Sequence, residues 1–505
     1  MNEIEVKLSY EGSFEPEGLG LEDEGVSTIT TLEPQELHAT YYDTQDLRLA
    51  RNAITLRWRR GEADTPVWTL KLPSDNGKAS VRRELTFPSA TKNPPKRIPK
   101  EVSGLVTAFA RSEALAAMAE MTSSRRRWLL LGGNSEELAE ISDDEVSVSR
   151  DGERTEAWRE IEVEARSLPL EGLRRLTNVL VVAGAKEAPP MPKLIRALGD
   201  AAAVSPEPDW PRRLDDAGPA SQVVRHALGS GFQRIVGNDP ATRLGDVEPL
   251  HQMRVGTRRL RSDLRTFAPL IDGAWAEPLV VDLRWLADLL GKVRDIDVLR
   301  DVFAASGDDL QEALQPLFAE LSDRRATEQA VLLDALGSAR YIDFLDRLVA
   351  AVEAPVLSAE ADRAGGETLA PLVTKAWRKL AAKAEKAGPT SSEEELHKVR
   401  IHAKRVRYAA EAVAPSLAGK RHDAALVFAK RAANAQDVLG TLHDSAMARA
   451  AIEALVPRLS TDGTALVAAG RLIERQERLG EDARASWPKA WSKLNKGRLR
   501  RWMTG

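Results

Sequence analysis

Short segments in which apolar and polar residues alternate dominate the first 190 residues of the chain. The segment 54–59 reads ITLRWR, for example, and the segment 160–164 reads EIEVE. A period of two is typical of a half-buried β-strand. Turn signals, such as SDNG at 74–77 and GGN at 132–134, separate these segments. The pattern predicts strands at 3–8, 54–59, 68–72, 81–87, 125–131 and 160–164, and helices near 100–111 and 170–184.

A proline-rich stretch ends this region, and a helical region follows it. Three prolines lie within residues 201–215. Because proline lacks a backbone N–H and disfavours helix at the preceding residue, we expect this stretch to be a semi-rigid linker. Beyond it, Ala, Leu, Arg and Glu recur at helical spacing. The sequence therefore predicts two domains, 1–200 and 216–505, and the second of them is entirely α-helical.

The helical region contains an internal repeat. The hexapeptide LHQMRV at 250–255 recurs as LHKVRI at 396–401. A second pair, LGKVRD and LGTLHD, follows at nearly the same offset, so one helical unit is duplicated in the chain. We expect the two copies to span about 216–350 and 365–505.

Composition narrows the chemistry. Of the 505 residues, 43% are hydrophobic and 29% are charged, which is ordinary for a folded protein. The absence of cysteine excludes disulfides, thiolate catalysis, zinc fingers and iron–sulfur clusters. A bound metal must therefore rest on carboxylates or histidines, and carboxylates favour Mg²⁺ or Mn²⁺. The net charge of −4 offers no overall attraction for polyanions, so anion binding must come from local clusters.

The sequence gives no sign of a membrane or secretory segment. No apolar run approaches the ~20 residues that cross a bilayer. The N-terminal sequence MNEIEVKL lacks the basic and apolar parts of a secretory signal. We therefore expect a cytoplasmic protein with no membrane partner.

Charged residues share one face of several predicted strands. Because side chains alternate across a sheet, Glu3, Glu5 and Lys7 lie on one face of their strand, and Arg57 and Arg59 share a face of theirs. An antiparallel sheet could expose this charged face to water. Alternatively, the sheet could close into a barrel with a charged lumen. Such a lumen would hold a row of phosphates on Arg and Lys, and carboxylates would hold a bridging metal.

The order of the charged strands resembles the CYTH family, the triphosphate tunnel metalloenzymes. The Glu-x-Glu-x-Lys pattern at residues 3–7 is similar to the N-terminal signature of that family. Later motifs follow in the family's order, and the resemblance covers about residues 1–200. These motifs are YYDT at 41–44 with LRL at 47–49, ITLRWR at 54–59, WTLK at 68–71, RRE at 82–84, RRRW at 125–128, EIEVE at 160–164 and PK at 192–193.

This resemblance implies a closed antiparallel β-tunnel that hydrolyses or rearranges triphosphates with Mg²⁺ or Mn²⁺. Carboxylates would surround the metal, and basic residues would grip the phosphates. Asp144 is an alternative to Asp143, because a shift of one residue changes the face of a strand, and Glu160 is an alternative to Glu162. The implied metal ligands are Glu3, Glu5, Asp143, Glu162 and Glu164, and the implied catalytic residues are Glu3, Glu5, Lys7, Arg57, Arg59, Lys71, Arg82, Arg125 and Lys193.

Each copy of the helical repeat carries a basic stripe. Steps of three and four residues place basic residues on one helix face and apolar residues on another, so we expect the apolar face to pack. A charged face is most often simply solvated. These stripes, however, are almost purely cationic, and such dense like charges repel unless an anion binds. The basic residues are His251, Arg254, Arg258, Arg261 and Arg265, and His397, Arg400, Lys404 and Arg407; the apolar ones are Met253, Thr257, Leu260, Leu264 and Phe267, and Val399, Ala403, Val406, Ala410 and Val413.

The two basic copies resemble the CHAD domain, a histidine-containing α-helical domain found fused to CYTH. The resemblance rests on LH-x-x-R in both copies and on the later pairs that end at Asp295 and Asp444, and it covers about residues 216–505. It implies two pseudo-symmetric helical bundles that bind inorganic polyphosphate. The copies differ where Arg294 corresponds to His443, so equal contributions need not follow. The implied polyphosphate-binding residues are His251, Arg254, Arg258, Arg261, His397, Arg400, Lys404 and Arg407.

The expected fold class is multidomain α+β, a closed antiparallel β-tunnel followed by an all-α domain of two bundles. We expect metal-dependent hydrolysis of inorganic tripolyphosphate, polyphosphate binding by the helices and association with polyphosphate granules. One alternative is a polyphosphate-targeting scaffold with little catalysis. Another is class IV adenylyl cyclase or thiamine triphosphatase activity, with Trp58, Trp68 or Trp128 stacking on an organic group rather than packing in a core. Nucleic acid is a weaker candidate partner, because the basic stripes carry almost no aromatic residues.

Overall fold

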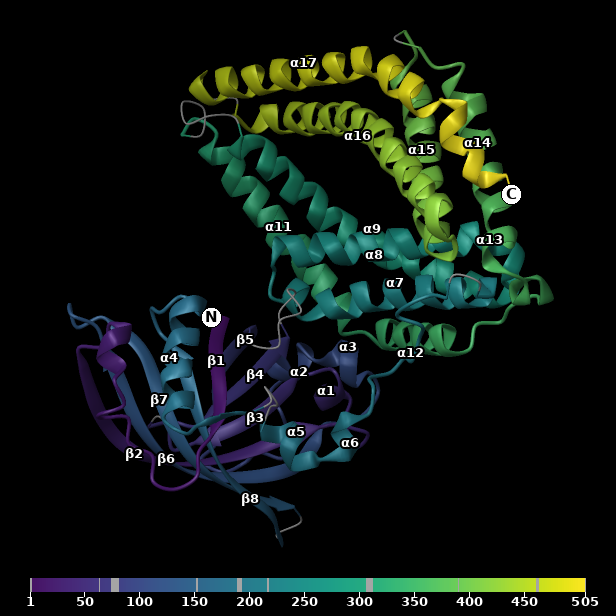
Figure 1. Ribbon diagram of the computed structural model, residues 1–505. Coiled ribbons are helices and arrows are strands. Elements are labelled where there is room, and N and C mark those ends of the chain that lie inside the picture. The colour runs from purple at the N-terminus through teal and green to yellow at the C-terminus, as the bar shows by residue number, and fades with distance from the viewer. Residues whose placement is uncertain are drawn as a thin grey trace. The chain divides into compact units, whose positions relative to one another are not determined.

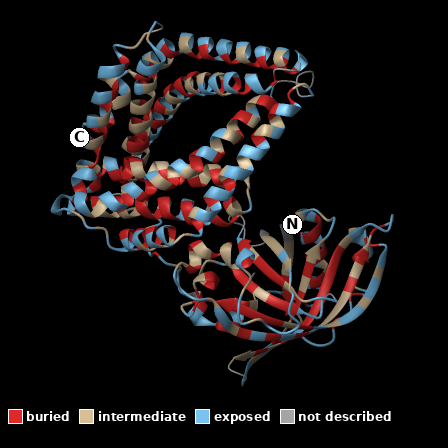
Figure 2. Ribbon diagram, turned by 180° about the vertical axis from the view of Figure 1, so that it is seen from behind, coloured by how far each residue is buried: buried red, intermediate tan, exposed pale blue. Residues whose placement is uncertain are grey.

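The computed structural model of the chain contains two compact units, Met1–Glu207 and Pro208–Gly505 (Figure 1). The first is built mainly of strands and the second of helices, and buried positions run through both (Figure 2). No helix among the described residues is long and apolar enough to cross a membrane. The structure describes residues 2–62, 64–73, 81–150, 153–188, 193–215, 218–305, 312–388, 390–459 and 463–504, with the backbone alone at 2, 3, 81, 82 and 203.

The first unit is organised around one nine-stranded antiparallel sheet in the order β5-β4-β3-β2-β6-β7-β8-β1-β9. Strand β1 pairs with β8 along one side and also with β5 over three residue pairs, so the sheet curls around a central space. The predicted antiparallel, tunnel-like architecture is therefore confirmed, but the expected full closure is not: among the described residues, β1 and β5 pair over these three residue pairs only. The strands are β1 (Asn2–Ser9), β2 (Thr28–Asp43), β3 (Thr55–Arg60), β4 (Val67–Pro73), β5 (Val81–Pro88), β6 (Ala116–Leu131), β7 (Glu137–Arg150), β8 (Glu153–Ala165) and β9 (Lys186–Glu187).

Apolar cores cover the outer face of this sheet. Trp128 packs in a core that includes the apolar face of α4 (Leu170–Val182), and Trp58 and Trp68 pack in another beside α2 (Lys100–Gly104). All three tryptophans are buried, so they fill cores and do not offer a stacking surface in the tunnel. The remaining helices of this unit are η1 (Leu21–Glu24), α1 (Arg48–Arg51), α3 (Thr107–Ala110), α5 (Lys193–Leu198) and α6 (Asp200–Ala203).

The turn after β2 is built around the buried carboxylate of Asp43. Its oxygens accept hydrogen bonds from the backbone N–H groups of Thr44, Leu49 and Ala50 at 2.7, 2.9 and 2.8 Å. Burial raises the pKa of Asp43, although these hydrogen bonds act in the opposite direction. The carboxylate satisfies N–H groups at the start of the short helix α1, which have no partner within the helix itself. It thereby fixes the connection from β2 to β3.

The second unit consists of two sets of helices that repeat one another. Helices α7, α8 and α9 pack in sequence, as do α14, α15 and α16, and α8 also packs against α15. Residues of α9 and α11 share one apolar core with residues of α16 and α17. The helices are α7 (Ala220–Arg243), α8 (Val247–Thr266), η2 (Ala268–Leu270), α9 (Gly273–Ala304), α11 (Gln315–Leu336), α12 (Ala339–Glu353), η3 (Ala359–Asp362), α13 (Gly365–Thr368), α14 (Ala370–Ala384), α15 (Glu393–Val413), η4 (Ala414–Ser416), α16 (Gly419–Leu455), η5 (Val456–Leu459), α17 (Gly463–Leu494) and η6 (Gly497–Met503).

The basic helices α8 and α15 pack through their apolar stripes, as predicted. A capping box formed by Ser392 and Glu395 begins α15. Arg259 of α8 and Arg407 of α15 both donate to the carboxylate of Glu411, at 2.6 and 2.8 Å, which joins the two repeats. The buried stripe residues are Met253, Thr257, Leu260 and Leu264 in α8, Phe267 directly after it, and Val399, Ala403, Val406, Ala410 and Val413 in α15.

Replacement of Asp43 by Asn should destabilise the first unit. An amide offers one accepting oxygen where the carboxylate offers two, so at least one buried N–H loses its partner. We expect a loss of about 2 kcal/mol in the free energy of unfolding, seen as a lower thermal midpoint and as faster amide hydrogen exchange at residues 43–54. Asp46→Asn is the matched control and should have a smaller effect, because the Asp46 side chain is 37% exposed. Unchanged hydrogen exchange in Asp43→Asn would contradict the prediction.

Candidate functional site

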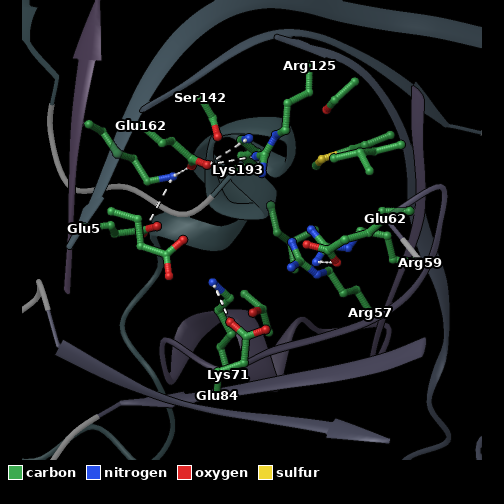
Figure 3. Close-up of a pocket in the computed structure, with 18 of the residues that line it drawn as sticks. Glu5, Arg57, Arg59, Glu62, Lys71, Glu84, Arg125, Ser142, Glu162 and Lys193 are labelled. Atoms are coloured by element: carbon green, nitrogen blue, oxygen red, sulfur yellow. Dashed lines mark hydrogen bonds and ion pairs between the residues drawn. The ribbon is translucent and has the colours of Figure 1, made fainter. Parts of the chain in front are cut away.

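A cavity of about 580 Å³ lies inside the sheet of the first unit. The charged faces of the strands line it, so the arrangement with a charged lumen is the correct one. In Figure 3, Glu5 and Glu162 lie on one side of the cavity, and Arg57 and Arg59 lie on the other. The predicted residues that line the cavity are Glu5, Lys7, Arg57, Arg59, Lys71, Arg125, Glu162, Glu164 and Lys193.

Two further predicted residues, Glu3 and Arg82, have side chains outside the part of the chain that the structure describes. Their backbones are register partners across β1 and β5. Their assignment to the metal and to the phosphates stays a prediction.

A network of ion pairs fills one side of the tunnel. Lys7 Nζ lies 2.5 Å from Glu162, and Arg125 makes two hydrogen bonds of 2.6 Å to the buried carboxylate of Asp144. Lys193 contacts Asp144 and lies 3.5 Å from Glu162. Each charge in this network therefore faces at least one opposite charge within a few ångströms.

Burial and charge act in opposite directions within this network. Burial favours the neutral form of Glu162, yet Lys193, Lys7 and Arg125 hold its pKa well below its usual range. Burial likewise lowers the pKa values of Lys7 and Lys193, but the surrounding carboxylates outweigh it and raise both above the ordinary value. All of these groups are charged at neutral pH, because mutual pairing compensates for the loss of water.

The structure places Asp143 and Asp144 on opposite faces of β7. Asp143 accepts hydrogen bonds from Arg126 at 2.6 Å and from Arg159 at 2.7 Å. Asp144 instead pairs with Arg125, which lines the cavity. The prediction that Asp143 lies among the tunnel carboxylates is therefore wrong, and Asp144 takes that place, because successive side chains of a strand face opposite sides.

Glu160 and Glu162 share the inner face of β8 but differ in depth. Glu162 lines the cavity. Glu160 is buried and accepts a hydrogen bond from Trp158 Nε1 at 3.0 Å. Its Oε1 atom has no hydrogen-bond partner among the described residues, although Lys193 Nζ lies 3.2 Å away. Glu162 can therefore contact a ligand in the cavity, whereas Glu160 lies deeper and does not line the cavity.

Cations of β3 and β4 form the other wall of the cavity. Burial lowers the pKa of Arg59 to about 9, and the charges of Arg57 and Arg125 contribute. Arg59 nevertheless stays protonated at neutral pH. Lys71 lies 3.0 Å from Glu84, its register partner across β4 and β5. This wall presents delocalised guanidinium groups and one ammonium, the groups that bind phosphate oxygens.

Tyr41 also lines the cavity, although in the sequence it stands out only as part of the YYDT motif at 41–44. It lies on β2 directly opposite Arg57 of β3. Burial acts to raise the pKa of Tyr41, but Arg57, Lys193 and Arg59 outweigh this and lower it. Strand register, which brings these residues together, is not visible in one sequence. Other lining residues not predicted as site residues include Glu62, Glu84, Ser123, Ser142 and Arg166.

Two groups of carboxylates could hold a divalent cation. Oxygen atoms of Asp144, Glu160 and Glu162 lie within 4.8 Å of one another, but the network cations already oppose these charges. Glu5 and Glu164 are register partners on β1 and β8, and like charges in that position repel unless a cation lies between them. Burial raises the pKa of Glu164 against the charge of Arg166, and the carboxylates of Glu140 and Glu5 add to the rise. Glu5 and Glu164 therefore form a second candidate pair of ligands for Mg²⁺ or Mn²⁺. Their nearest cations are Lys7, 3.8 Å from Glu5, and Arg166, 3.2 Å from Glu164.

In the second unit, the basic stripes of α8 and α15 converge on Lys404. Burial lowers the pKa of Lys404 to about 6, and the charges of Arg258, Arg400, Arg254 and Arg261 contribute to the shift. Three of these arginines belong to α8, so both repeats supply the cluster. The dense positive charge and partial burial together make this a candidate site for a polyanion.

Several polar atoms of this cluster are buried without a hydrogen-bond partner among the described residues. They are Nδ1 of His251 and His397, and Nε of Arg258, Arg261 and Arg400. A buried polar group without a partner costs about 1–3 kcal/mol. A ligand rich in oxygen acceptors would satisfy the guanidinium donors.

Arg407 differs from the other predicted polyphosphate-binding residues. Its hydrogen bond to Glu411 raises its pKa against the effect of burial, so its charge is already matched within its own helix. Arg254 is paired more loosely, because its partner Asp295, at 2.9 Å, is 70% exposed and screened by water.

The two histidines of the repeats have different neighbours. Burial lowers the pKa of His251, and the charge of Arg294 adds to the effect. His397 lies beside His443 instead, with ring centroids 4.6 Å apart. The substitution noted between the two copies therefore changes the charge beside each histidine.

Comparison with known proteins agrees with both units. Residues 1–185 match the CYTH domain family, and residues 226–453 match the CHAD domain family. The chain is 32% identical over 517 residues to the uncharacterised protein Rv2226 of Mycobacterium tuberculosis, and the match covers 94% of this chain and 93% of that protein. The chain belongs to the family of proteins that join a CYTH domain to a CHAD domain. CYTH domains are metal-dependent, and the family comprises triphosphate tunnel enzymes.

Solved structures resemble each unit separately. The CHAD domain from the plant Ricinus communis is 26% identical, with a TM-score of 0.46, and the match covers 56% of this chain and 95% of that one. HpAC1 from Hippeastrum, described as having a dominant triphosphatase activity, is 17% identical, with a TM-score of 0.26. That match covers 39% of this chain and 95% of the other.

Replacement of Glu164 by Gln should weaken metal binding. The change removes one of two facing carboxylates, so we expect the affinity for Mn²⁺ to fall by about tenfold or more. Electron paramagnetic resonance of unbound Mn²⁺ measures this without reference to activity. Glu145→Gln is the matched control, because Glu145 is exposed on the same face of β7 as Asp143. Equal Mn²⁺ affinity in the two variants would show that Glu164 is not a ligand.

Proposed function

We propose that the tunnel hydrolyses inorganic tripolyphosphate to diphosphate and phosphate with Mg²⁺ or Mn²⁺. The observation that carries this proposal is the division of the cavity into two walls. Arg57 and Arg59 lie on one side of the cavity and Glu5 lies on the other (Figure 3). Glu164 is the register partner of Glu5, and Lys71 adds a further cation to the lining. A linear triphosphate needs cations along its oxygens and a divalent ion to bridge them.

Positioning and charge neutralisation account for most of what a protein contributes to phosphoryl transfer. Arg57 and Arg59 can each bind two non-bridging oxygens, and Lys71 adds a compact positive charge. Glu5 and Glu164 would hold the cation at the opposite wall. The cation, when bound, supplies charge neutralisation and an activated water for in-line attack.

Direct attack by water is the favoured route. Ser123 and Ser142 line the cavity, but no histidine among the described residues does so, and the chain contains no cysteine. A serine nucleophile needs an adjacent base. A covalent phosphoenzyme therefore has no support in this arrangement.

An organic triphosphate is the second candidate substrate. Leu37, Ala39, Met121 and Leu194 give the cavity an apolar patch, which an inorganic substrate does not need. Class IV adenylyl cyclase or thiamine triphosphatase activity would use this patch. The three tryptophans suggested for stacking are buried in the outer cores, so the patch is the feature that favours this candidate.

Replacement of Glu5 by Gln should lower metal-dependent phosphate release from tripolyphosphate by about 100-fold or more, because the metal loses a ligand. Circular dichroism should show an unchanged fold. The Glu145→Gln control should keep the rate of the unaltered protein. Full turnover in Glu5→Gln would exclude the mechanism.

The substrate can be identified by measuring phosphate release from tripolyphosphate, ATP, thiamine triphosphate and long polyphosphate, each with Mg²⁺ and with Mn²⁺. Tripolyphosphate as the best substrate supports the proposal. A preference for ATP or thiamine triphosphate favours the second candidate. No phosphate release from any of them favours the scaffold alternative.

We further propose that the helical unit binds inorganic polyphosphate in the cytoplasm, at polyphosphate granules. The support is the cationic cluster around Lys404, with its buried guanidinium donors. Nucleic acid fits less well, because Tyr408, the aromatic residue beside the cluster, is buried under Arg258 and Arg407. It therefore offers no face to a base.

Replacement of both Arg258 and Arg400 by Gln should reduce the affinity for long polyphosphate by about tenfold or more, because two charge-assisted contacts are lost. Isothermal titration calorimetry at fixed salt measures the effect. Lys398→Gln is the matched control: Lys398 is exposed on the same helix and pairs with Glu394 at 2.6 Å. Unchanged affinity in the double variant, or tighter binding of single-stranded RNA by the unaltered protein, would contradict the proposal.

A further inference from the structure

One carboxylate that lines the tunnel pairs with a cation of the proposed phosphate-binding wall, and this carboxylate does not belong to a strand. Glu62 follows β3 and forms an ion pair with Arg59, three residues before it (Figure 3). By contrast, Glu84 lies on β5, where strand pairing holds it opposite Lys71. Glu62 therefore differs from the other cavity carboxylates in being carried by a turn.

The buried charge of Arg59 is only weakly neutralised. Its side chain is 9% exposed, whereas that of Glu62 is 40% exposed. Water screens the charge of a carboxylate exposed to this degree, so the ion pair is weak. Arg59 Nε is also buried without a hydrogen-bond partner among the described residues. A phosphate group could satisfy this donor as well as the charge.

The backbone around Glu62 places its carboxylate at the cavity. Gly61 has φ +98°, and a Cβ atom there would lie 1.9 Å from the backbone oxygen of Glu36. Only glycine permits this close approach to β2. The Gln35 side chain donates a hydrogen bond of 3.5 Å to the Glu62 carbonyl. The turn is thus fixed against β2 while the Glu62 carboxylate projects toward Arg59.

We propose that Glu62 is a displaceable internal anion, which occupies the phosphate position on Arg59 until a ligand phosphate replaces it. This inference rests on the proposed binding of phosphates in the tunnel. Every phosphate that reaches Arg59 must displace the carboxylate, so Glu62 weakens the binding of substrate and product alike. Weaker product binding favours release from a cavity that is otherwise rich in cations.

The test compares Glu62→Gln with the unaltered residue in the full chain. Because the helical unit is also proposed to bind phosphates, both proteins carry Arg254→Gln, Arg258→Gln and Arg400→Gln. Inorganic phosphate and tripolyphosphate are titrated separately by calorimetry. Glu36→Gln is the matched control, since Glu36 is an exposed acid on the strand that contacts Gly61.

We expect Glu62→Gln to bind both ligands about fivefold more tightly, the effect of one partly exposed ion pair, and Glu36→Gln to bind as before. Misfolding cannot produce tighter binding. Equal affinities in Glu62→Gln and Glu36→Gln, or no phosphate binding at all, would overturn the inference. Weaker binding in Glu62→Gln would also overturn it and would make Glu62 a positioning residue for Arg59.

The outcome is separable from that of the hydrolysis experiment. If Glu62→Gln tightens phosphate binding but no phosphate is released from tripolyphosphate, the inference about Glu62 stands and the proposed hydrolysis is wrong.

Discussion

Charge burial within a curled sheet is the constraint on which the first unit depends. Alternation along the strands places apolar residues in the outer cores and charged residues inside. Charges removed from water must be matched, and the tunnel matches them in part by register: Lys7 stands opposite Glu162, and Lys71 opposite Glu84. Where register instead opposes Glu5 to Glu164, two like charges face one another, and this pair is the candidate place for a metal ion.

The two units differ in how they compensate their buried positive charges. The tunnel contains its own counter-charges, so it can fold with its cations in place and exchange partners when a ligand enters. The cluster around Lys404 draws four arginines together from two helices, and the acids nearest to it, such as Asp295, are exposed. The positive charges of this cluster therefore repel one another and are not fully compensated by buried acids. Packing of the apolar stripes of α8 and α15, together with the bridge of Arg259 and Arg407 to Glu411, holds the cluster together.

The sequence predicted six of the nine described strands, the two helical repeats and most of the tunnel lining, because each depends on periodicity within a single segment. It did not predict β2, β7 or β9. It chose Asp143 over Asp144 wrongly, because alternation shows that neighbours face apart but not which of them faces inward. Tyr41 was not predicted as a site residue, because its place opposite Arg57 depends on strand register. Glu62 was not predicted, because its contact with Arg59 depends on the turn beside β2. Likewise, each basic stripe was visible alone, but their meeting at Lys404 depends on how α8 packs against α15.

Lys404 links occupancy of the helical cluster to the acidity of its surroundings. With a pKa of about 6, its amine is largely uncharged at neutral pH. A polyanion lodged among the four arginines replaces repulsion by attraction and draws the pKa upward, so the amine takes a proton from solvent as the ligand arrives. Capture then grows weaker as the medium turns alkaline, and release of the chain returns the proton. If the helical unit binds polyphosphate as proposed, each binding event would thereby take up protons from solvent.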